Sequence, residues 1–193
     1  MSVLAWMKSL LGHGLGRAAD VSAAAQSAFD AGLAAFAGRD FAGAIAAFER
    51  AVAWDDGNAD AHNNLGLAYL EAGRSADAAD AFAVALELRP QFPQAHYNTA
   101  LAALARDEVE RAVTALRQAI RIWPDYAAAH NALGYLLSHR TGEFAEGAAH
   151  IRRALDLAPE DRDVRCNYSA ILVQEGHAHD AIRVCDEIGR AHV

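Results

Sequence analysis

Apolar positions along the chain follow a spacing of three and four residues that is interrupted at regular places. In one stretch they fall at Leu65, Ala68 and Tyr69, stop near Gly73 and resume at Ala78. A period near 3.6 residues predicts amphipathic helices, and a glycine in the interruption suits the turn between two of them. The pattern therefore predicts a helix–turn–helix unit in this stretch.

The same unit recurs along the chain at an almost constant interval. The segments ALELRP, AIRIWP and ALDLAP end at Pro90, Pro124 and Pro159, which are 34 and 35 residues apart. Proline cannot continue a helix, so each of these residues marks the end of a unit. A repeat of this length is typical of arrays in which every unit buries its apolar face against its neighbours.

Small and bulky residues recur in the same register. The small columns are Gly32, Gly66, Ala100 and Gly134; Ala44, Ala78, Ala112, Gly147 and Ala181; and Ala51, Ala85, Ala119 and Ala154. The bulky column is Phe48, Phe82, Leu116, Ile151 and Cys185. Small residues allow two helix axes to approach closely, and a bulky residue fills the space between them. We therefore expect these columns to form the packing surface between helices.

The stretch over residues 61–90 resembles a tetratricopeptide repeat (TPR) in its Leu65-Gly66 pair, in Tyr69 and in the series Ala78, Phe82, Ala85 and Pro90. The same pattern covers residues 25–58, 59–92, 93–126, 127–161 and 162–187; the fourth repeat has one extra residue near Thr141-Gly142, and the fifth is incomplete. The resemblance implies an all-α fold, a right-handed α-solenoid of helix–turn–helix repeats over residues 25–187.

Residues 1–24 precede the repeats. Val3, Leu4, Met7, Leu10 and Leu11 share one face of a helix in this segment. Four interpretations remain open: a helix that caps the first repeat, a membrane-interface helix formed by residues 1–17, a signal peptide, and a disordered segment.

Residues 188–193, with the sequence IGRAHV, resemble the translation of a sequencing adapter. We therefore expect this hexapeptide to be a non-native tail and the natural protein to continue beyond residue 187; a genuine short tail is the alternative. A solenoid without its last helix would expose an apolar edge through which the protein can oligomerise.

Charge and cysteine content narrow the class of partner. The chain has a net charge of −8 and a single lysine, Lys8, which argues against nucleic-acid binding. Cys166 and Cys185 are too few for a disulfide framework, so we expect reduced thiols and a cytoplasmic protein. Peripheral attachment to a membrane is the alternative location.

The residues that carry chemistry do not form a catalytic pattern. His62, His96 and His130 recur every 34 residues, but equivalent positions of stacked repeats lie too far apart to ligate one metal ion. We assign these histidines to packing between repeats. The chain lacks a nucleophile elbow, a phosphate-binding loop and an HExxH motif, so we expect neither enzyme activity nor a cofactor or metal in this stretch.

In the TPR family the first helix of each repeat lines a concave groove. By resemblance, the groove residues here are Phe29, Asp30, Leu33, Asn63, Asn64, Leu67, Glu71, Tyr97, Asn98, Leu101, Asn131, Tyr135 and Asn167. Asn64, Asn98 and Asn167 share one column, which Ala132 interrupts, and this column resembles the asparagine ladder of O-linked N-acetylglucosamine transferase. An asparagine amide can pair with both the C=O and the N–H of an extended peptide. Contacts within the repeat itself are the alternative role for these asparagines.

The expected groove contains no lysine or arginine, unlike the TPR cochaperones that clamp a C-terminal carboxylate. We therefore expect a protein or peptide partner that is neutral or basic and makes apolar contacts. The function expected from the resemblance is an interaction scaffold. Two alternatives remain: the substrate-recognition part of a larger glycosyl-, sulfo- or methyltransferase, and a membrane-associated assembly factor.

Overall fold

A computed structural model describes the backbone of residues 21–190 and the side chains as far as residue 184. The predictions for residues 1–20 and 191–193, and for the side chain of Cys185, lie outside the described residues. The chain divides into two compact units, one ending at Pro90 and the other beginning at Gln91.

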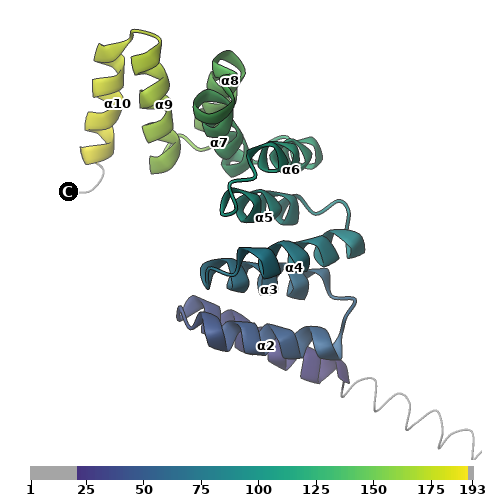
Figure 1. Cartoon of the computed structure of the whole chain (residues 1–193). Coiled ribbons are helices and arrows are strands. Elements are labelled where there is room, and N and C mark those ends of the chain that lie inside the picture. The colour runs from purple at the N-terminus through teal and green to yellow at the C-terminus, as the bar shows by residue number, and fades with distance from the viewer. Residues whose placement is uncertain (1–20, 191–193) are drawn as a thin grey trace, which may run out of the picture. The chain divides into compact units, whose positions relative to one another are not determined.

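The regular structure of the described residues is helical (Figure 1). The first unit contains a helix over residues 21–37, α2 (Phe41–Trp54), α3 (Ala59–Glu71) and α4 (Ser75–Leu88). The second unit contains α5 (Pro93–Leu104), α6 (Val109–Ile122), α7 (Ala127–Leu136), the π-helical turn η1 (Leu137–Thr141), α8 (Phe144–Leu157), α9 (Arg162–Gln174) and α10 (Ala178–Arg190). The pairs α3–α4, α5–α6, α7–α8 and α9–α10 pack as neighbours (Figure 1).

The first helices of the later repeats begin at Ala59, Pro93, Ala127 and Arg162, which are 34, 34 and 35 residues apart. Polar caps or proline fix several helix starts. Asn58 Oδ1 accepts a hydrogen bond from the backbone N–H of Ala61 at 3.0 Å, which satisfies one of the open donors at the start of α3. Pro93 lies at the first position of α5, where its missing N–H is not needed.

Two helices run across the expected limits of the repeat array, whose boundaries stay a prediction. The helix that contains the start of the first expected repeat includes residues 21–24 as well. At the other end α10 continues to Arg190, so residues 188–190 extend the last helix.

The small and bulky columns meet as expected in the first unit. Phe48 and Phe82 are fully buried. A Cβ atom added to Gly66 would lie 2.5 Å from Cε1 of Phe82, and one added to Gly32 would lie 2.5 Å from Cε1 of Phe48. These approaches are shorter than any van der Waals contact, so each ring occupies space that only a glycine leaves open.

The second unit repeats this packing with aliphatic side chains. Leu116 and Ile151 are fully buried, and Leu133 and Leu137 lie in the same interior. A Cβ atom on Gly134 would lie 2.6 Å from Cγ1 of Ile151. The alanines of the other two columns are buried in both units, which confirms that the columns are packing surfaces.

The turn between the two helices of each repeat contains one residue with positive φ. These residues are Arg39, Gly73, Asp107, Gly142 and Gly176, with φ between 60° and 85°. Glycine adopts this conformation without strain, whereas other residues pay a steric cost. The expected role of Gly73 as a turn residue is therefore confirmed.

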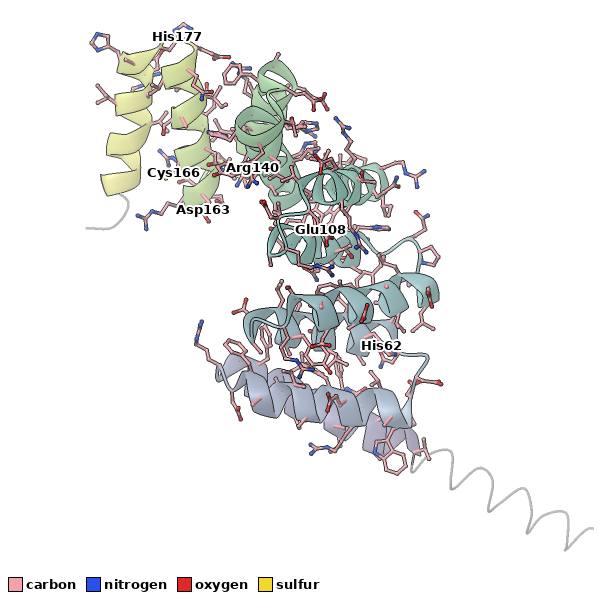
Figure 2. All side chains as sticks on the ribbon, viewed as in Figure 1. His62, Glu108, Arg140, Asp163, Cys166 and His177 are labelled. Carbon is pink, nitrogen blue, oxygen red and sulfur yellow. The ribbon has the colours of Figure 1, made fainter. Side chains whose placement is uncertain are left out.

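The extra residue of the fourth repeat lies in the turn between α7 and α8. The chain there forms η1, whose wider turn accommodates one more residue than an α-helix, before Gly142 reverses its direction. Such single π-turns are frequent at functional sites. Arg140, which lies within this one, faces α9 (Figure 2).

Candidate functional site

The second unit contains an open hollow of about 490 Å³ between α7, η1 and α9, with α5 at its edge. Its lining residues are Leu104, Asn131, Ala132, Tyr135, Leu136, Arg140, Asp163, Cys166 and Asn167. Figure 2 shows Arg140 facing the side of α9 that carries Asp163 and Cys166. A volume of this size is in the range of pockets that bind small molecules or a few peptide residues. Three of the expected groove residues, Asn131, Tyr135 and Asn167, meet here.

Two asparagine amides from successive repeats are paired in the hollow. Nδ2 of Asn167 donates a hydrogen bond to Oδ1 of Asn131 at 2.9 Å. This contact uses one N–H of Asn167 and one lone pair of Asn131, so both N–H groups of Asn131 and the oxygen of Asn167 keep hydrogen-bonding capacity. Both side chains are partly exposed. The pair therefore offers donors and an acceptor at fixed positions.

Apolar groups form much of the remaining wall. Leu104, Ala132 and Leu136 contribute aliphatic surface. Tyr135 is 45% exposed, and its ring stacks on that of His139 with 4.6 Å between ring centres. Cys166 contributes an exposed free thiol. An apolar wall beside a few fixed polar groups is typical of a binding site.

Arg140 corrects the expectation that the groove has no basic residue. Its Nη2 donates a hydrogen bond to Oδ1 of Asp107 at 2.5 Å, and the two side chains are 44% and 81% exposed. Asp163, in the first turn of α9, lines the same hollow. The hollow thus offers one charge of each sign. The sequence pattern did not place Arg140 in the groove because this residue lies one position beyond the last column of the expected groove, that of Glu71.

The other groove residues expected in the second unit lie outside the lining of the hollow. Asn98 is only 6% exposed. Tyr97 is partly buried and packs on Tyr126, with 5.3 Å between ring centres. Leu101 remains partly exposed. Asn98 is thus largely covered within the second unit, and its role in the expected groove stays a prediction.

In the first unit, the polar residues of the expected groove have local partners. Nδ2 of Asn64 donates to the backbone oxygen of Asp60 at 2.8 Å, one helical turn earlier. Asp30 accepts a hydrogen bond from Gln26 at 2.8 Å, and Asn63 is only 6% exposed. Asn64 thus fits the alternative role of contacts within its own repeat.

The apolar residues of the expected groove in the first unit divide between interior and surface. Phe29 packs against Phe48, with 5.7 Å between ring centres. Leu33 is 41% exposed, Leu67 is partly exposed, and Glu71 lies at the surface near the end of α3. Leu33, Leu67 and Glu71 therefore remain available for contacts.

Two of the three recurrent histidines, His62 and His130, contact the loops that precede their helices. Nε2 of His62 lies 3.1 Å from the backbone oxygen of Asp56, and Nε2 of His130 lies 2.9 Å from that of Pro124. In each case the ring bonds to the residue six positions earlier, in the loop before its own helix. This is a structural role at the junction of repeats, and the described residues contain no group of three or more potential metal ligands.

His130 has a second partner that the sequence pattern did not indicate. Nδ1 of His130 lies 2.8 Å from Nδ1 of His150, on α8. Because a carbonyl oxygen only accepts, Nε2 of His130 must donate to Pro124, so its Nδ1 accepts a proton from Nδ1–H of His150. Burial, and then His130, lower the pKa of His150, while Glu146 opposes them. The pair therefore favours one neutral tautomer of each ring.

A sequence profile described as the tetratricopeptide repeat matches residues 29–96, 63–126 and 97–162. The overlapping matches together span more than half of the chain. No curated protein matches it. Within the described residues, no helix has the length and apolar content needed to cross a membrane.

Several solved structures resemble the chain. PilF of Pseudomonas aeruginosa has 17% identity and a TM-score of 0.80, and the match covers 90% of this chain and 79% of PilF. TTC0263, a thermophilic TPR protein of Thermus thermophilus, has 20% identity and a TM-score of 0.71, with 86% and 90% covered. YrrB, described as a TPR protein with an unusual peptide-binding site, has 17% identity and a TM-score of 0.65, with 86% of each chain covered. At these identities the likeness shows the fold, and it confirms an all-α solenoid of TPR type.

Proposed function

The chain belongs to the tetratricopeptide repeat family, and we propose that it is an interaction scaffold that binds an extended segment of a protein partner in the hollow of the second unit. The family supports the general role of protein interaction. The observation that carries the specific proposal is the Asn131–Asn167 pair beside an apolar wall.

The peptide backbone pairs with the two amides. A segment in extended conformation presents its C=O and N–H groups alternately, which suits the free N–H groups of Asn131 and the free oxygen of Asn167. One apolar side chain of the segment then contacts Leu104, Ala132 and Leu136. These contacts depend on the backbone and the hydrophobicity of the bound segment more than on its particular sequence.

The charges of the hollow revise the expected partner. Arg140 and Asp163 have opposite signs, so the hollow selects neither a basic nor an acidic segment as a whole. We propose a segment that is mainly apolar and close to neutral. Leu33, Leu67 and Glu71 of the first unit and Leu101 of the second remain predicted contacts with a partner, each within its own unit.

The tetratricopeptide repeat profile matches the chain between residues 29 and 162, which supports a non-catalytic role for this stretch. The cytoplasmic location, the membrane contact through residues 1–17 and a downstream transferase domain stay predictions. Recovery of the natural gene tests the last of these, because a transferase would have to be encoded after the repeats.

The proposal is tested with a peptide selected on the full chain from a random display library. The double variant Asn131→Ala/Asn167→Ala removes both amides at once and leaves neither without its partner. We expect the Kd of the selected peptide to rise about fivefold or more, since two lost hydrogen bonds amount to about 1–3 kcal/mol. Asn64→Ala, which removes a comparable amide outside the hollow, is the matched control and should leave the Kd unchanged. An unchanged Kd in the double variant would exclude the amide pair from binding.

A further inference from the structure

The first unit contains an open recess of about 240 Å³ between α3 and α4. From α3, His62, Leu65 and Tyr69 contribute to its wall, and from α4, Ala81 and Val84 do so. His62 lies near the start of α3 (Figure 2). The recess shares no residue with the hollow of the second unit. We call it the His62 recess.

His62 presents an unused hydrogen-bond acceptor in this recess. Its Nε2 lies 3.1 Å from the backbone oxygen of Asp56. Because a carbonyl oxygen only accepts, Nε2 donates this bond, and Nδ1 of the neutral ring keeps a lone pair. Among the described residues, no group donates a hydrogen bond to Nδ1 of His62. The recess therefore has one polar atom that a ligand with an N–H group can use.

The fourth repeat shows which group fits beside such a histidine. In the register of the repeats His62 corresponds to His130, and Ala81 corresponds to His150. Both His62 and His130 bond through Nε2 to the residue six positions earlier, which gives the two rings the same orientation. Nδ1 of His130 accepts a hydrogen bond from Nδ1–H of His150 at 2.8 Å. An imidazole ring thus occupies, in the fourth repeat, the place that the small side chain of Ala81 leaves open in the second.

The remaining wall of the His62 recess suits a flat ring. Leu65 and Val84 supply apolar surface. The ring of Tyr69 is held in place, because its hydroxyl donates a hydrogen bond to Oε1 of Glu49 at 2.7 Å. A wall that is fixed before binding loses little conformational freedom when a ligand enters.

Two carboxylates of α4, those of Asp77 and Asp80, lie at the edge of the recess. Asp77 is already paired with Arg74 at 2.7 Å, and Asp80 is exposed. Exposed charges of this kind contribute little to binding. A ligand therefore needs an N–H donor to use the recess fully, and it needs no positive charge.

We propose that the His62 recess is a second interaction surface, which binds the imidazole side chain of a histidine in a protein partner. The ring N–H of the partner donates to Nδ1 of His62, and the ring lies over Ala81 as that of His150 does beside His130. Leu65 and Val84 contact the faces and edge of the bound ring. This site lies in the first unit and does not depend on peptide binding in the hollow.

An NMR titration of the full chain at about pH 8.5, where an ordinary histidine is neutral, tests the proposal. The probes are the capped peptide Ala-His-Ala and the same peptide with its imidazole methylated on one nitrogen. A neutral imidazole carries a single N–H, so the methylated ring has none, although the two rings have nearly the same shape. The signals to follow are those of the His62 ring and of the Ala81 amide. His177 is exposed, lies in the turn between α9 and α10 (Figure 2) and serves as internal control.

We expect the histidine peptide to shift the signals of His62 and Ala81 in a saturable way, with a Kd at least about twofold lower than that of the methylated peptide. Equal Kd values would show that no hydrogen bond to Nδ1 forms and would overturn the proposal. An absent shift at His62, or an equal shift at His177, would overturn it as well.

A variant that fills the recess gives a second test. Ala81→His places an imidazole of the chain itself where the fourth repeat has His150, so it should raise the Kd of the histidine peptide about fivefold or more. Ala83→His adds the same side chain at an exposed position of α4 outside the recess, and it should leave the Kd unchanged. Circular dichroism checks that both variants keep their helicity. An unchanged Kd in folded Ala81→His would contradict the proposal. If this variant does not fold, the comparison of the two peptides on the unmodified chain decides.

Discussion

The His130–His150 pair makes the stability of the second unit depend on pH. Each ring bonds through Nδ1 to the other at 2.8 Å, and His130 is 7% exposed. The pKa of His150 is lowered in the folded protein, chiefly by burial, from an ordinary value of 6.5. The unfolded chain therefore binds more protons below pH 6.5 than the folded one.

The sign and size of the effect follow from this difference. The contribution of His150 is complete above pH 6.5 and is lost as the pH falls from there toward the lowered folded pKa. One proton changes the free energy of unfolding by about 1.4 kcal/mol per pH unit, so the loss at pH 5 is at most about 2 kcal/mol. The groups that face His150 are His130, Glu146 and Arg117, and of these Glu146 reduces the effect.

Two variants distinguish the effect of protonating His150 on stability from the effect of its hydrogen bond to His130. In His150→Asn the amide Nδ2 takes the place of Nδ1 and still donates to His130, but it does not titrate. In His150→Ala the buried Nδ1 of His130 loses its donor, which costs about 1–3 kcal/mol at every pH. Urea unfolding followed by circular dichroism at pH 8 and pH 5 gives the free energies. We expect His150→Asn to lose less stability between these pH values than the wild type. Equal losses in the two proteins would refute the role of His150.

Three further predictions concern packing, backbone and ionisation. Gly66→Ala should lower the free energy of unfolding by about 1–2 kcal/mol in urea denaturation, because the new methyl group overlaps the ring of Phe82 and the gain in helix propensity is smaller than this clash. Arg39→Gly should raise it by about 0.5 kcal/mol in the same assay, since φ at this turn is +60°. In an alkaline titration followed by ultraviolet absorbance, Tyr69 and Tyr126 should ionise at a pKa of about 12, because burial raises both values, and each phenylalanine variant should reduce the last part of the rise.

The repeat architecture could be predicted because it depends on short-range pattern. The spacing of Gly66 and Phe82 specifies which helix faces meet, and the structure places these two residues in direct contact. The turn at Gly73 follows from the same register. These features repeat along the chain, so each occurrence supports the others.

The candidate site could be predicted only in part. Asn98 and Asn167 share a column, yet Asn98 is 6% exposed whereas Asn167 lines the hollow. The column determines on which face of its helix a residue lies. The side chains of neighbouring helices determine how much of that residue is covered. Arg140 was missed for a different reason, since it lies one position beyond the last column of the expected groove, that of Glu71.

The sequence pattern also did not predict the contact between His130 and His150. The ladder of histidines identified His130, but His150 has no counterpart in the other repeats. The contact is determined by the packing of α8 on α7. The only signal in the sequence was a histidine at a position where the three preceding repeats have alanine.

The central claim is that a peptide segment occupies the hollow of the second unit, and the thiol of Cys166 reports on this directly. Cys166 is exposed and lines the hollow, so iodoacetamide reaches it in the free protein. The measurement is the rate of alkylation of Cys166, followed by mass spectrometry, with and without a saturating amount of the selected peptide. The account predicts a rate at least about tenfold lower in the complex, because an occupied site stays closed to reagent except when the peptide dissociates, and no change with a scrambled peptide. An unchanged rate in the saturated complex would contradict it.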